Sequence, residues 1–296
     1  MTWELFAPAT TANLGPGFDV LGAALDLEAS FLVEAGPGGF AWPEGVEPPI
    51  GPNLFLDAFK AAFAARGQQA PEVSVQATRL LPLRAGLGSS ASAICAGLRA
   101  ADLFLSSPLA PREALRIATA LEGHPDNVAA CLFGGVTIAS GMADPLLRRL
   151  PAPPLRAVAL YPGGSTSTPW SRAALPPLVP RGSAVHNIGR TALLVYAMLE
   201  GDYALLRDAT EDRLHEAERI GDCAWCAAAR AAAYDAGAYA MPVSGSGPTM
   251  LAITSPERAD TVYSALLPFA RQLPGGMIWN LGFTEQAARA RALEPR

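Results

Sequence analysis

Lysine is nearly absent from this 296-residue sequence, in which Lys60 is the only one and arginine supplies the other positive side chains. The formal net charge is −5, and the sequence contains no cluster of basic residues. Proteins that bind nucleic acids or anionic membrane surfaces usually carry such a cluster. We therefore expect no nucleic acid and no membrane among the partners of this protein.

Long apolar runs are also missing. No segment approaches the roughly 20 consecutive apolar residues that a membrane-spanning helix needs. The N-terminus, MTWELFAPATTANLG, lacks the basic start and the following apolar segment of a secretory signal. These absences predict a cytoplasmic protein.

Cysteine is scarce, with four residues in the chain. Cys223 and Cys226 have the Cys-x-x-Cys spacing of redox-active pairs, but they fall in an alanine-rich helical run without a flanking βαβ pattern. The sequence offers no second pair that would complete a zinc site. We interpret the two cysteines as ordinary helical residues, with reduced thiols as expected in the cytoplasm.

What the sequence does contain is apolar residues, which make up 50% of it, against 17% charged residues. This balance predicts a folded core, and the length fits one large domain or two ordinary ones. Apolar spacing and breaker residues predict helices over about 54–66, 91–105, 111–121, 185–200, 202–218 and 222–237. Alternating and β-branched patterns predict strands over 3–9, 29–35, 72–81, 132–140, 155–162, 239–247 and 249–255.

A proline-rich segment divides these elements. DPLLRRLPAPPLRAVALYPGG, residues 144–164, contains four prolines before a new strand, and we place a domain boundary near residue 150. Strands and helices do not alternate regularly enough for a doubly wound parallel sheet. The order of elements therefore predicts an α+β fold in two parts, residues 1–150 and 151–296.

A glycine- and serine-rich stretch, LRAGLGSSASAIC, precedes the helix predicted from residue 91. Gly86 and Gly88 allow positive φ and close approach of the backbone to a ligand. Serines at the helix start, with the free N–H groups and the dipole there, favour an anion. The stretch lacks the lysine of a Walker A motif, so phosphate charge would be met by amides, a metal ion and arginine. Taken alone, a plain turn before a helix fits it as well.

Three further stretches combine glycine with polar residues: APATTANLGPGFDVLGAAL, LEGHPDNVAACLFGG and VSGSGPTML. Together with GLGSSAS, these motifs, which run from residue 7 to residue 249, resemble the homoserine kinase family of the GHMP superfamily of small-molecule kinases. NLGPGFDVLG and EGHPDNVA are the parts typical of homoserine kinases. The opening motif and the two glycine-rich loops are shared across the superfamily.

The resemblance implies the fold and the assembly. Its N-terminal domain is similar to the second domain of ribosomal protein S5, and its C-terminal domain is ferredoxin-like. Residues 1–150 would then carry the ATP phosphate loop, and residues 151–296 would contribute substrate-binding residues. Because relatives are commonly dimers, a homodimer is a further expectation.

The resemblance also implies ATP and Mg²⁺ as cofactors. In the family, backbone amides of the segment matching residues 82–92 wrap the ATP phosphates. The implied ATP-binding residues are Pro82, Leu83, Arg84, Ala85, Gly86, Leu87, Gly88, Ser89, Ser90, Ala91 and Ser92. Ser90 would hold Mg²⁺ together with Glu122, which as a bare residue would equally be a solvated acid at a helix end. Asn53 matches a position near the nucleotide base.

The acceptor side is implied by polar residues of the other motifs. Asn13 and Asp19 match residues that hold the reacting hydroxyl, although in a glycine-rich stretch such residues usually form turns. Asn127 matches a third polar residue of the acceptor site. It stands where relatives such as mevalonate kinase have an acid, and an amide cannot act as a base near neutral pH. Catalysis is thus assigned to Asp19, Asn127 and Ser90.

Selection of an amino acid would depend on the second half of the chain. Thr168 and Arg172 match a segment that reaches the α-carboxylate of the substrate. Arg219 matches an arginine of a downstream motif, although EAER here replaces the EPYR-like pattern. Gly245 lies where the family lets backbone approach the substrate. Asn187 and Arg190 either face the site or serve as a helix cap and a surface charge, and His186 and His215 are interpreted as structural.

The activity that the resemblance implies is phosphorylation of the side-chain hydroxyl of L-homoserine by ATP, giving O-phospho-L-homoserine on the route to threonine. Two alternatives stay open. Another kinase of the superfamily would act on mevalonate or a related alcohol, without a use for paired arginines. A nucleotide-binding regulator would bind ATP without transferring phosphate to any amino alcohol.

Overall fold

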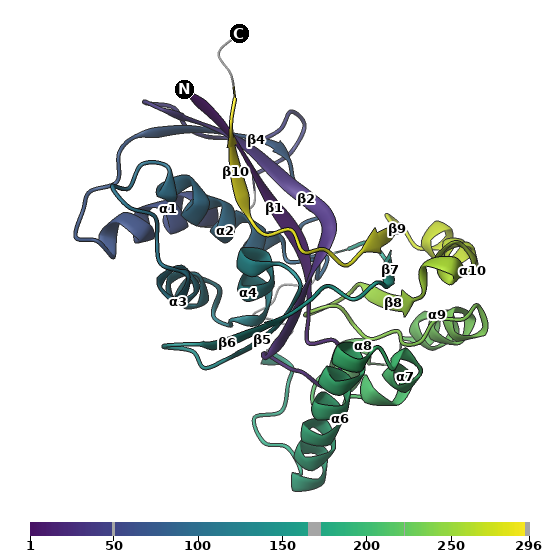
Figure 1. Ribbon diagram of the computed structural model, residues 1–296. Helices are drawn as coiled ribbons and strands as arrows, with labels where there is room; N and C mark the ends of the chain where they lie inside the picture. Colours follow the sequence, from purple (N-terminus) through teal and green to yellow (C-terminus); the bar gives the residue numbers. More distant parts are fainter. Residues whose placement is uncertain (49–50, 165–172, 222, 294–296) are drawn as a thin grey trace.

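The computed structural model describes residues 1–48, 51–164, 173–221 and 223–293 (Figure 1). Among them, seven strands form one mainly antiparallel sheet. These strands are β1 (Thr2–Ala12), β2 (Leu21–Ala35), β3 (Gly39–Ala41), β4 (Val73–Arg79), β5 (Val136–Ser140), β6 (Leu146–Leu150) and β10 (Arg289–Ala292). The order is β10–β1–β2–β4–β3, with β5 paired to β2 and β6 paired to β5.

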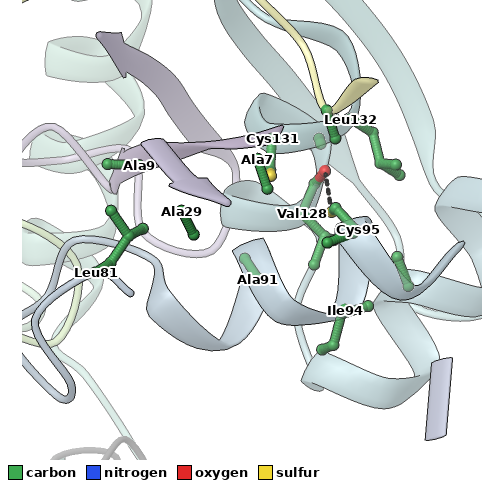
Figure 2. Packing of buried hydrophobic residues seen from close by; sticks show 14 of the residues in the cluster. Ala7, Ala9, Ala29, Leu81, Ala91, Ile94, Cys95, Val128, Cys131 and Leu132 are labelled. Carbon is green, nitrogen blue, oxygen red and sulfur yellow. Dashed lines mark hydrogen bonds between the residues drawn. The ribbon is translucent and has the colours of Figure 1, made fainter. Parts of the chain in front are cut away.

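Helices from the first half of the chain cover one face of this sheet (Figure 1). They are α1 (Leu54–Ala64), α2 (Ser89–Asp102), α3 (Pro111–Glu122) and α4 (Asp126–Phe133). Helix α2 packs against the other three and against β1, and small residues allow this, since a Cβ at Gly97 would overlap the Phe55 carbonyl oxygen. Figure 2 shows the alanine-rich seam, where the Cys95 thiol donates to the Val128 carbonyl oxygen at 3.6 Å. The start of α2 is thereby held by a rigid core.

The second half of the chain builds a three-stranded antiparallel sheet in the order β8–β7–β9. Its strands are β7 (Arg156–Tyr161), β8 (Met250–Thr254) and β9 (Met277–Gly282), and α9 (Ala224–Asp235) and α10 (Ala259–Gln272) pack on it. Other helices among the described residues of this half are α6 (Arg181–Glu200), α7 (Leu206–Ala209), α8 (Glu216–Ile220) and the short 3₁₀ helices η1 (Tyr203–Leu205) and η2 (Pro256–Arg258). Helix α6 projects from the body in Figure 1. Within the described residues, no helix combines the length and the apolar character that crossing a membrane requires.

Most predicted elements are confirmed, with ends shifted by a few residues. The strand predicted over 132–140 is wrong in its first part, because α4 continues to Phe133 and β5 begins only at Val136. The helix predicted over 202–218 is interrupted, since the Asp212 carboxylate accepts backbone N–H groups and starts α8 anew. The segment 239–247 forms isolated bridges at Ala240 and Val243 instead of a strand. Strands β3 and β6, helix α4 and the elements after β8 were not predicted.

The chain passes from the first sheet to the second between β6 and β7, beside the predicted division at residue 150. The final strand, β10, returns to the first sheet and pairs antiparallel with β1, from Trp3 opposite Ala292 to Phe6 opposite Arg289. The division into residues 1–150 and 151–296 stays a prediction about folding units. Whether or not the chain folds as these two units, β10 belongs to the first sheet although it lies in the second half of the sequence.

A disulfide joins Cys223 to Cys226 at the start of α9. The interpretation of these two cysteines as reduced helical residues is therefore wrong, although α9 itself is helical. Their Cα atoms are 5.4 Å apart, a separation that a disulfide can bridge. Cys95 and Cys131 are free and buried.

Candidate active site

Two adjoining cavities open at the N-terminus of α2. One, of about 60 Å³, is polar, and the other, of about 260 Å³, is mainly apolar. Arg84 and Ser89 line both. The polar cavity brings together residues that the sequence assigned to one site: Asn13, Asp19, Glu122, Asn127, Arg219 and Gly245. Motifs as far apart as 232 positions thus meet at one helix start.

The loop before α2 depends on glycine for two reasons. Gly86 and Gly88 have φ of +77° and +70°, a region that residues with a Cβ rarely adopt. A Cβ at Gly88 would also overlap the Thr10 hydroxyl, and one at Gly86 would overlap the Ser244 carbonyl oxygen. The Thr10 N–H donates to the Leu87 carbonyl oxygen at 3.1 Å. A Gly88→Ala variant would therefore disturb packing as well as any phosphate contact.

Backbone amides dominate what this loop can offer to an anion. Gly88 is the N-cap of α2, and no side chain caps the helix there. The first N–H groups of a helix have no intrahelical partner and carry the positive end of its dipole. Leu83 and Arg84 have exposed side chains beside this helix start. Arg84 adds a positive charge there.

Several side chains of the predicted ATP-binding segment point away from the cavities. Ala85, Leu87 and Ala91 are buried in the core, so that only their backbone atoms remain available. The Ser92 hydroxyl donates to the Ser89 carbonyl oxygen at 2.9 Å inside the helix. The segment is thus suited to bind through its backbone, in keeping with the predicted cradle.

Ser90 and Glu122 meet beside this helix start. The Ser90 hydroxyl donates to the Glu122 carboxylate at 2.6 Å. Ser90 lies in the first turn of α2, and Glu122 is the last residue of α3. Burial raises the pKa of Glu122, whereas nearby His124 and the Ser90 hydroxyl act in the opposite direction. A buried carboxylate next to a hydroxyl is a hard oxygen donor set of the kind that Mg²⁺ prefers. The residues present therefore fit the predicted metal ion.

His124 and Asp126 form a buried pair in the polar cavity. His124 Nδ1 lies 2.5 Å from Asp126 Oδ1. Burial alone would lower the pKa of His124, but Asp126, with further contributions from Glu122 and Asp19, raises it to about 9. The imidazole therefore carries a proton at neutral pH. Asp19, His124 and Asp126 offer ligand atoms within 4.8 Å of one another, so a metal ion bound there would compete with the proton of His124.

The loop between β1 and β2 presents Asn13 and Asp19. Both residues have positive φ, +69° and +58°, and Leu14 shares this strained region. Asn13 Oδ1 accepts the Asp19 backbone N–H at 3.0 Å, and Asn13 Nδ2 donates to the Gly245 carbonyl oxygen at 3.0 Å. Asn13 therefore links two loops and fixes the backbone at Asp19. Asn13 is thus both a turn-forming residue and a residue of the candidate site.

Asn127 lies in the first turn of α4 and is buried. Its side-chain oxygen accepts the Thr10 hydroxyl at 2.7 Å, and its backbone N–H donates to Asp126 at 2.6 Å. The amide group thus has a fixed orientation at the wall of the polar cavity.

Arg219 and Gly245 meet at the opposite wall. Arg219 Nη1 donates to the Gly245 carbonyl oxygen at 2.5 Å and lies 3.0 Å from His215 Nδ1. Because a guanidinium only donates, Nδ1 accepts and the proton of His215 is on Nε2, which donates to the Gly15 carbonyl oxygen at 2.8 Å. Burial lowers the pKa of His215, in keeping with this neutral form. His215 orients Arg219, so its interpretation as merely structural is incomplete.

Asp212 organises the backbone around that arginine. Its carboxylate accepts the backbone N–H groups of His215 and Glu216, both at 2.8 Å, and Asn187 Nδ2 at 2.7 Å. Burial by itself would raise the pKa of Asp212, but His215 and these donors hold it below the usual value. Asn187 also donates to the Pro16 carbonyl oxygen at 3.1 Å, which joins α6 to the loop before β2.

Two other residues with open interpretations have structural roles. Asn187 is buried within α6 and caps no helix. Arg190 forms an ion pair with exposed Glu211 at 2.8 Å. Thr168 and Arg172, predicted to reach the substrate carboxylate, lie outside the described residues.

The larger cavity contains residues that the sequence did not point to. Phe40 and Trp42 from the region of β3 line it, with Phe31 and Leu83. The ring centroids of Phe40 and Trp42 are 5.0 Å apart. Asn53, the predicted neighbour of the base, lines the same cavity and caps α1 by accepting the Leu56 N–H at 3.1 Å. An apolar, aromatic cavity beside an anion-binding helix start suits a planar base linked to phosphates.

Known proteins are similar to this chain in sequence and in fold. The model of the GHMP kinases N terminal domain matches residues 53–135, and that of the GHMP kinases C terminal domain matches residues 194–270. A homoserine kinase of Desulfitobacterium hafniense is 39% identical over 88% of this chain and 90% of its own. One from Thermus thermophilus is 38% identical over 95% of this chain and 96% of its own. This chain belongs to the homoserine kinase family.

Solved structures agree with membership of the homoserine kinase family. The crystal structure of homoserine kinase from Cytophaga hutchinsonii superposes with a TM-score of 0.87, at 27% identity, over 98% of this chain and 97% of that one. The two-part α+β architecture predicted from the sequence is confirmed as the GHMP kinase fold. The chain is thus a kinase of this superfamily, with ATP as the phosphoryl donor that such a kinase uses.

Proposed function

We propose that this protein transfers the γ-phosphoryl group of ATP to the side-chain hydroxyl of L-homoserine. The hydroxyl oxygen forms a bond to the γ-phosphorus, the bond from that phosphorus to the β–γ bridging oxygen breaks, and the hydroxyl proton leaves. The products are ADP and O-phospho-L-homoserine, an intermediate on the route to threonine. The names of the similar proteins support this reaction.

The observation that carries the proposal is the convergence of three binding elements on one place. The α2 start can bind phosphate, the aromatic cavity can bind a base, and Arg219 with Asn13, Asp19 and Asn127 surrounds the polar cavity between them. A phosphoryl group bound at α2 would therefore face the acceptor. Such positioning is most of what phosphoryl transfer asks of a protein.

On the nucleotide side, we assign the base to the cavity that Phe40 and Trp42 line, and the phosphates to the backbone of residues 82–92. Ser90 and Glu122 would hold Mg²⁺, which when bound neutralises phosphate charge. Arg84 lines both cavities and would add a positive charge beside the phosphates. The protonated His124 contributes a second positive charge near the reacting groups.

On the acceptor side, Asp19 orients the hydroxyl by hydrogen bonding, and Asn13 holds the Asp19 backbone in place. Asn127 provides an amide where a base would otherwise stand, so the proton would leave to phosphate or water. Arg219 would bind the α-carboxylate, because a planar guanidinium can form paired hydrogen bonds with it. The same role is proposed for Arg172, with Thr168 beside it, and Gly245 would supply backbone contact.

The direct test is an ADP-release assay with ATP and L-homoserine, L-serine, L-threonine and mevalonate side by side. We expect L-homoserine to be the best substrate, and omission of Mg²⁺ to abolish turnover. Preference for mevalonate would instead assign the chain to another branch of the superfamily. Tight ATP binding without transfer to any acceptor would indicate a nucleotide-binding regulator and contradict the proposal.

We further propose a homodimer in the cytoplasm, as expected from the sequence. Light scattering on the purified protein would separate a dimer near twice the chain mass of 30.7 kDa from a monomer. A monomer at micromolar concentration would contradict the dimer without affecting the proposed reaction.

A further inference from the structure

The disulfide between Cys223 and Cys226 lies next to the proposed acceptor site. Cys223 is the N-cap of α9, and Cys226 lies in its first turn. Both cysteines line a cavity of about 190 Å³ whose wall includes Arg219, Ser246 and Gly247. The disulfide therefore shares one cavity with the arginine and the glycine-rich loop that we assign to the acceptor.

The position favours exchange with external thiols. Cys223 is half-buried and flanked by exposed Gly221 and Ala224, whereas Cys226 is 6% exposed and belongs to the core under α9. An external thiolate can thus reach the Cys223 sulfur, and the sulfur released is that of Cys226. A thiolate at the start of a helix is stabilised by the free N–H groups and the dipole there.

A purely structural role explains the pair less well. The stabilisation that a disulfide supplies by restricting the unfolded chain grows with the length of the loop that it closes. Only two residues, Ala224 and Trp225, stand between these cysteines. Helix α9 already fixes this turn through the Cys226 N–H, which donates to the Cys223 carbonyl oxygen at 3.1 Å. The disulfide therefore contributes little by restricting the unfolded chain, and the covalent tie that it adds at Cys223 is sensitive to redox conditions.

We propose that Cys223 and Cys226 form a thiol–disulfide exchange site that sets the affinity for the acceptor. A dithiol reductant, either a small molecule or a protein with a Cys-x-x-Cys pair, attacks Cys223 Sγ through one thiolate and displaces the Cys226 thiolate. The second thiol of the reductant then breaks the mixed disulfide. Two electrons and two protons pass to this protein, and the reductant becomes a disulfide. This inference rests on the proposed function for its effect on catalysis.

Coupling to the acceptor site passes through α8. This five-residue helix carries Arg219 and ends at Ile220, just before the disulfide. The disulfide fastens the segment between α8 and α9 to Cys226, whose side chain is packed in the core. Reduction leaves Cys223 with its noncovalent packing against the core under α9, so the chain next to α8 loses its covalent anchor close to the guanidinium that contacts Gly245. We expect weaker binding of the α-carboxylate and an unchanged nucleotide site.

The first experiment measures exchange without reference to catalysis. The folded protein is treated with dithiothreitol and then with iodoacetamide, and the labelled residues are located by mass spectrometry. We expect labels on Cys223 and Cys226 and none on buried Cys95 and Cys131. Labelling that appears only after unfolding would show a buried structural disulfide and overturn the proposal.

The second experiment measures the consequence. Reduction should raise the KM for L-homoserine about tenfold, within the range usual for coupling between sites, and leave the KM for ATP unchanged. Reoxidation with a small disulfide should restore it. The Cys223→Ser/Cys226→Ser variant should keep the higher KM under both conditions, whereas Cys131→Ala should respond like the parent. Equal KM values in the two redox states would overturn the proposal.

Hydrogen exchange separates this inference from the proposed function. The peptide that contains α8 should exchange faster in the reduced protein, whichever substrate the enzyme uses. If no homoserine is phosphorylated in either state but α8 responds, the proposed function fails and the exchange site stands. If homoserine is phosphorylated but α8 exchanges equally in both states, the proposed coupling is wrong.

Discussion

The nucleotide side and the acceptor side of this site are built in opposite ways. The proposed phosphate loop is a single segment, residues 82–92, whose contribution would come from its backbone and whose side chains are partly buried in the core. The acceptor side is assembled from side chains of distant segments, among them Asn13, Asn127 and Arg219, and hydrogen bonds across more than 100 positions hold Asn13 and Asn127. Single side-chain changes should therefore affect the acceptor side more than the nucleotide side.

The largest effect is expected at Arg219. Arg219→Ala removes one partner of a hydrogen-bonded charge pair with the substrate, which costs about 2–5 kcal/mol, or about 30-fold or more in the KM for L-homoserine. The KM for ATP should stay within about twofold of the parent. Arg190→Ala is the matched control, because it removes the same charge from a surface pair with Glu211. Equal effects of the two variants would refute the carboxylate assignment.

A change at Glu122 tests whether this residue is a ligand of the proposed Mg²⁺. Glu122→Gln should raise the Mg²⁺ concentration needed for half-maximal activity by about 10- to 100-fold, since it weakens one of two proposed protein ligands. Titration of activity with Mg²⁺ at fixed ATP measures this. Glu113→Gln, on the same helix and paired with Arg66 at the surface, is the control. An unaltered Mg²⁺ requirement in Glu122→Gln would move the ligand role elsewhere.

Asp19→Asn tests whether the acceptor side orients or deprotonates the hydroxyl. Removal of a general base typically costs about 10²–10⁴-fold in rate. An orienting role predicts a smaller loss in kcat, below about 100-fold, because an amide still forms hydrogen bonds. Single-turnover measurements at saturating substrates give this value. A loss near the upper end with unchanged binding would identify Asp19 as an indispensable base.

A smaller effect is expected at His215, which acts on the acceptor only through Arg219. His215→Ala should raise the KM for L-homoserine about 3- to 10-fold, the loss of one hydrogen bond. In the double variant with Arg219→Ala, the effect on this KM should not exceed that of Arg219→Ala alone. Additive effects would show that His215 acts through some other contact. Unfolding curves check that the variant is folded.

The last prediction concerns the pH dependence of stability at the His124–Asp126 pair and not a kinetic constant. Because the pKa of His124 in the folded protein is raised from 6.5 to about 9, its stabilisation is complete below pH 6.5 and is lost as the pH rises through about 9. The difference in unfolding free energy between the parent and His124→Gln, about 3 kcal/mol at most, should thus shrink from pH 6 to pH 10. Urea unfolding measures it. A difference that is constant over this range would exclude a protonated His124.

The nucleotide side was the more predictable part. Glycine at positions 86 and 88 and serine at positions 89 and 90 are local signals for a helix start, which the structure has at Ser89, while anion binding there stays a prediction. On the acceptor side, Asn127 lines the polar cavity, and its role as an amide in place of a base stays a prediction. Phe40 and Trp42 could not be found, because isolated aromatic residues near a short strand do not differ from ordinary core residues.

The acceptor side was predicted through resemblance and not through local pattern. The sequence contains no signal that Gly245 would accept hydrogen bonds from both Asn13 and Arg219. A signal for His215 did exist, since it stands four residues before Arg219 and such residues are neighbours on a helix. The Cys-x-x-Cys spacing was also visible in the sequence. The alanine-rich composition led to the interpretation of Cys223 and Cys226 as reduced helical residues. Such a composition indicates a helix but does not determine the oxidation state of cysteines in its first turn.

The sequence by itself determined the family, the phosphate loop and the order of most helices and strands, because these depend on contacts between near neighbours and on the backbone freedom of glycine. Tertiary structure alone decided which side chains share the polar cavity, that Asp126 raises the pKa of His124 although burial opposes this, and that the start of α9 lies beside Arg219. The physical reason is distance along the chain. Burial, pKa values and hydrogen bonds between remote segments arise only when folding brings those segments together and removes water from between them.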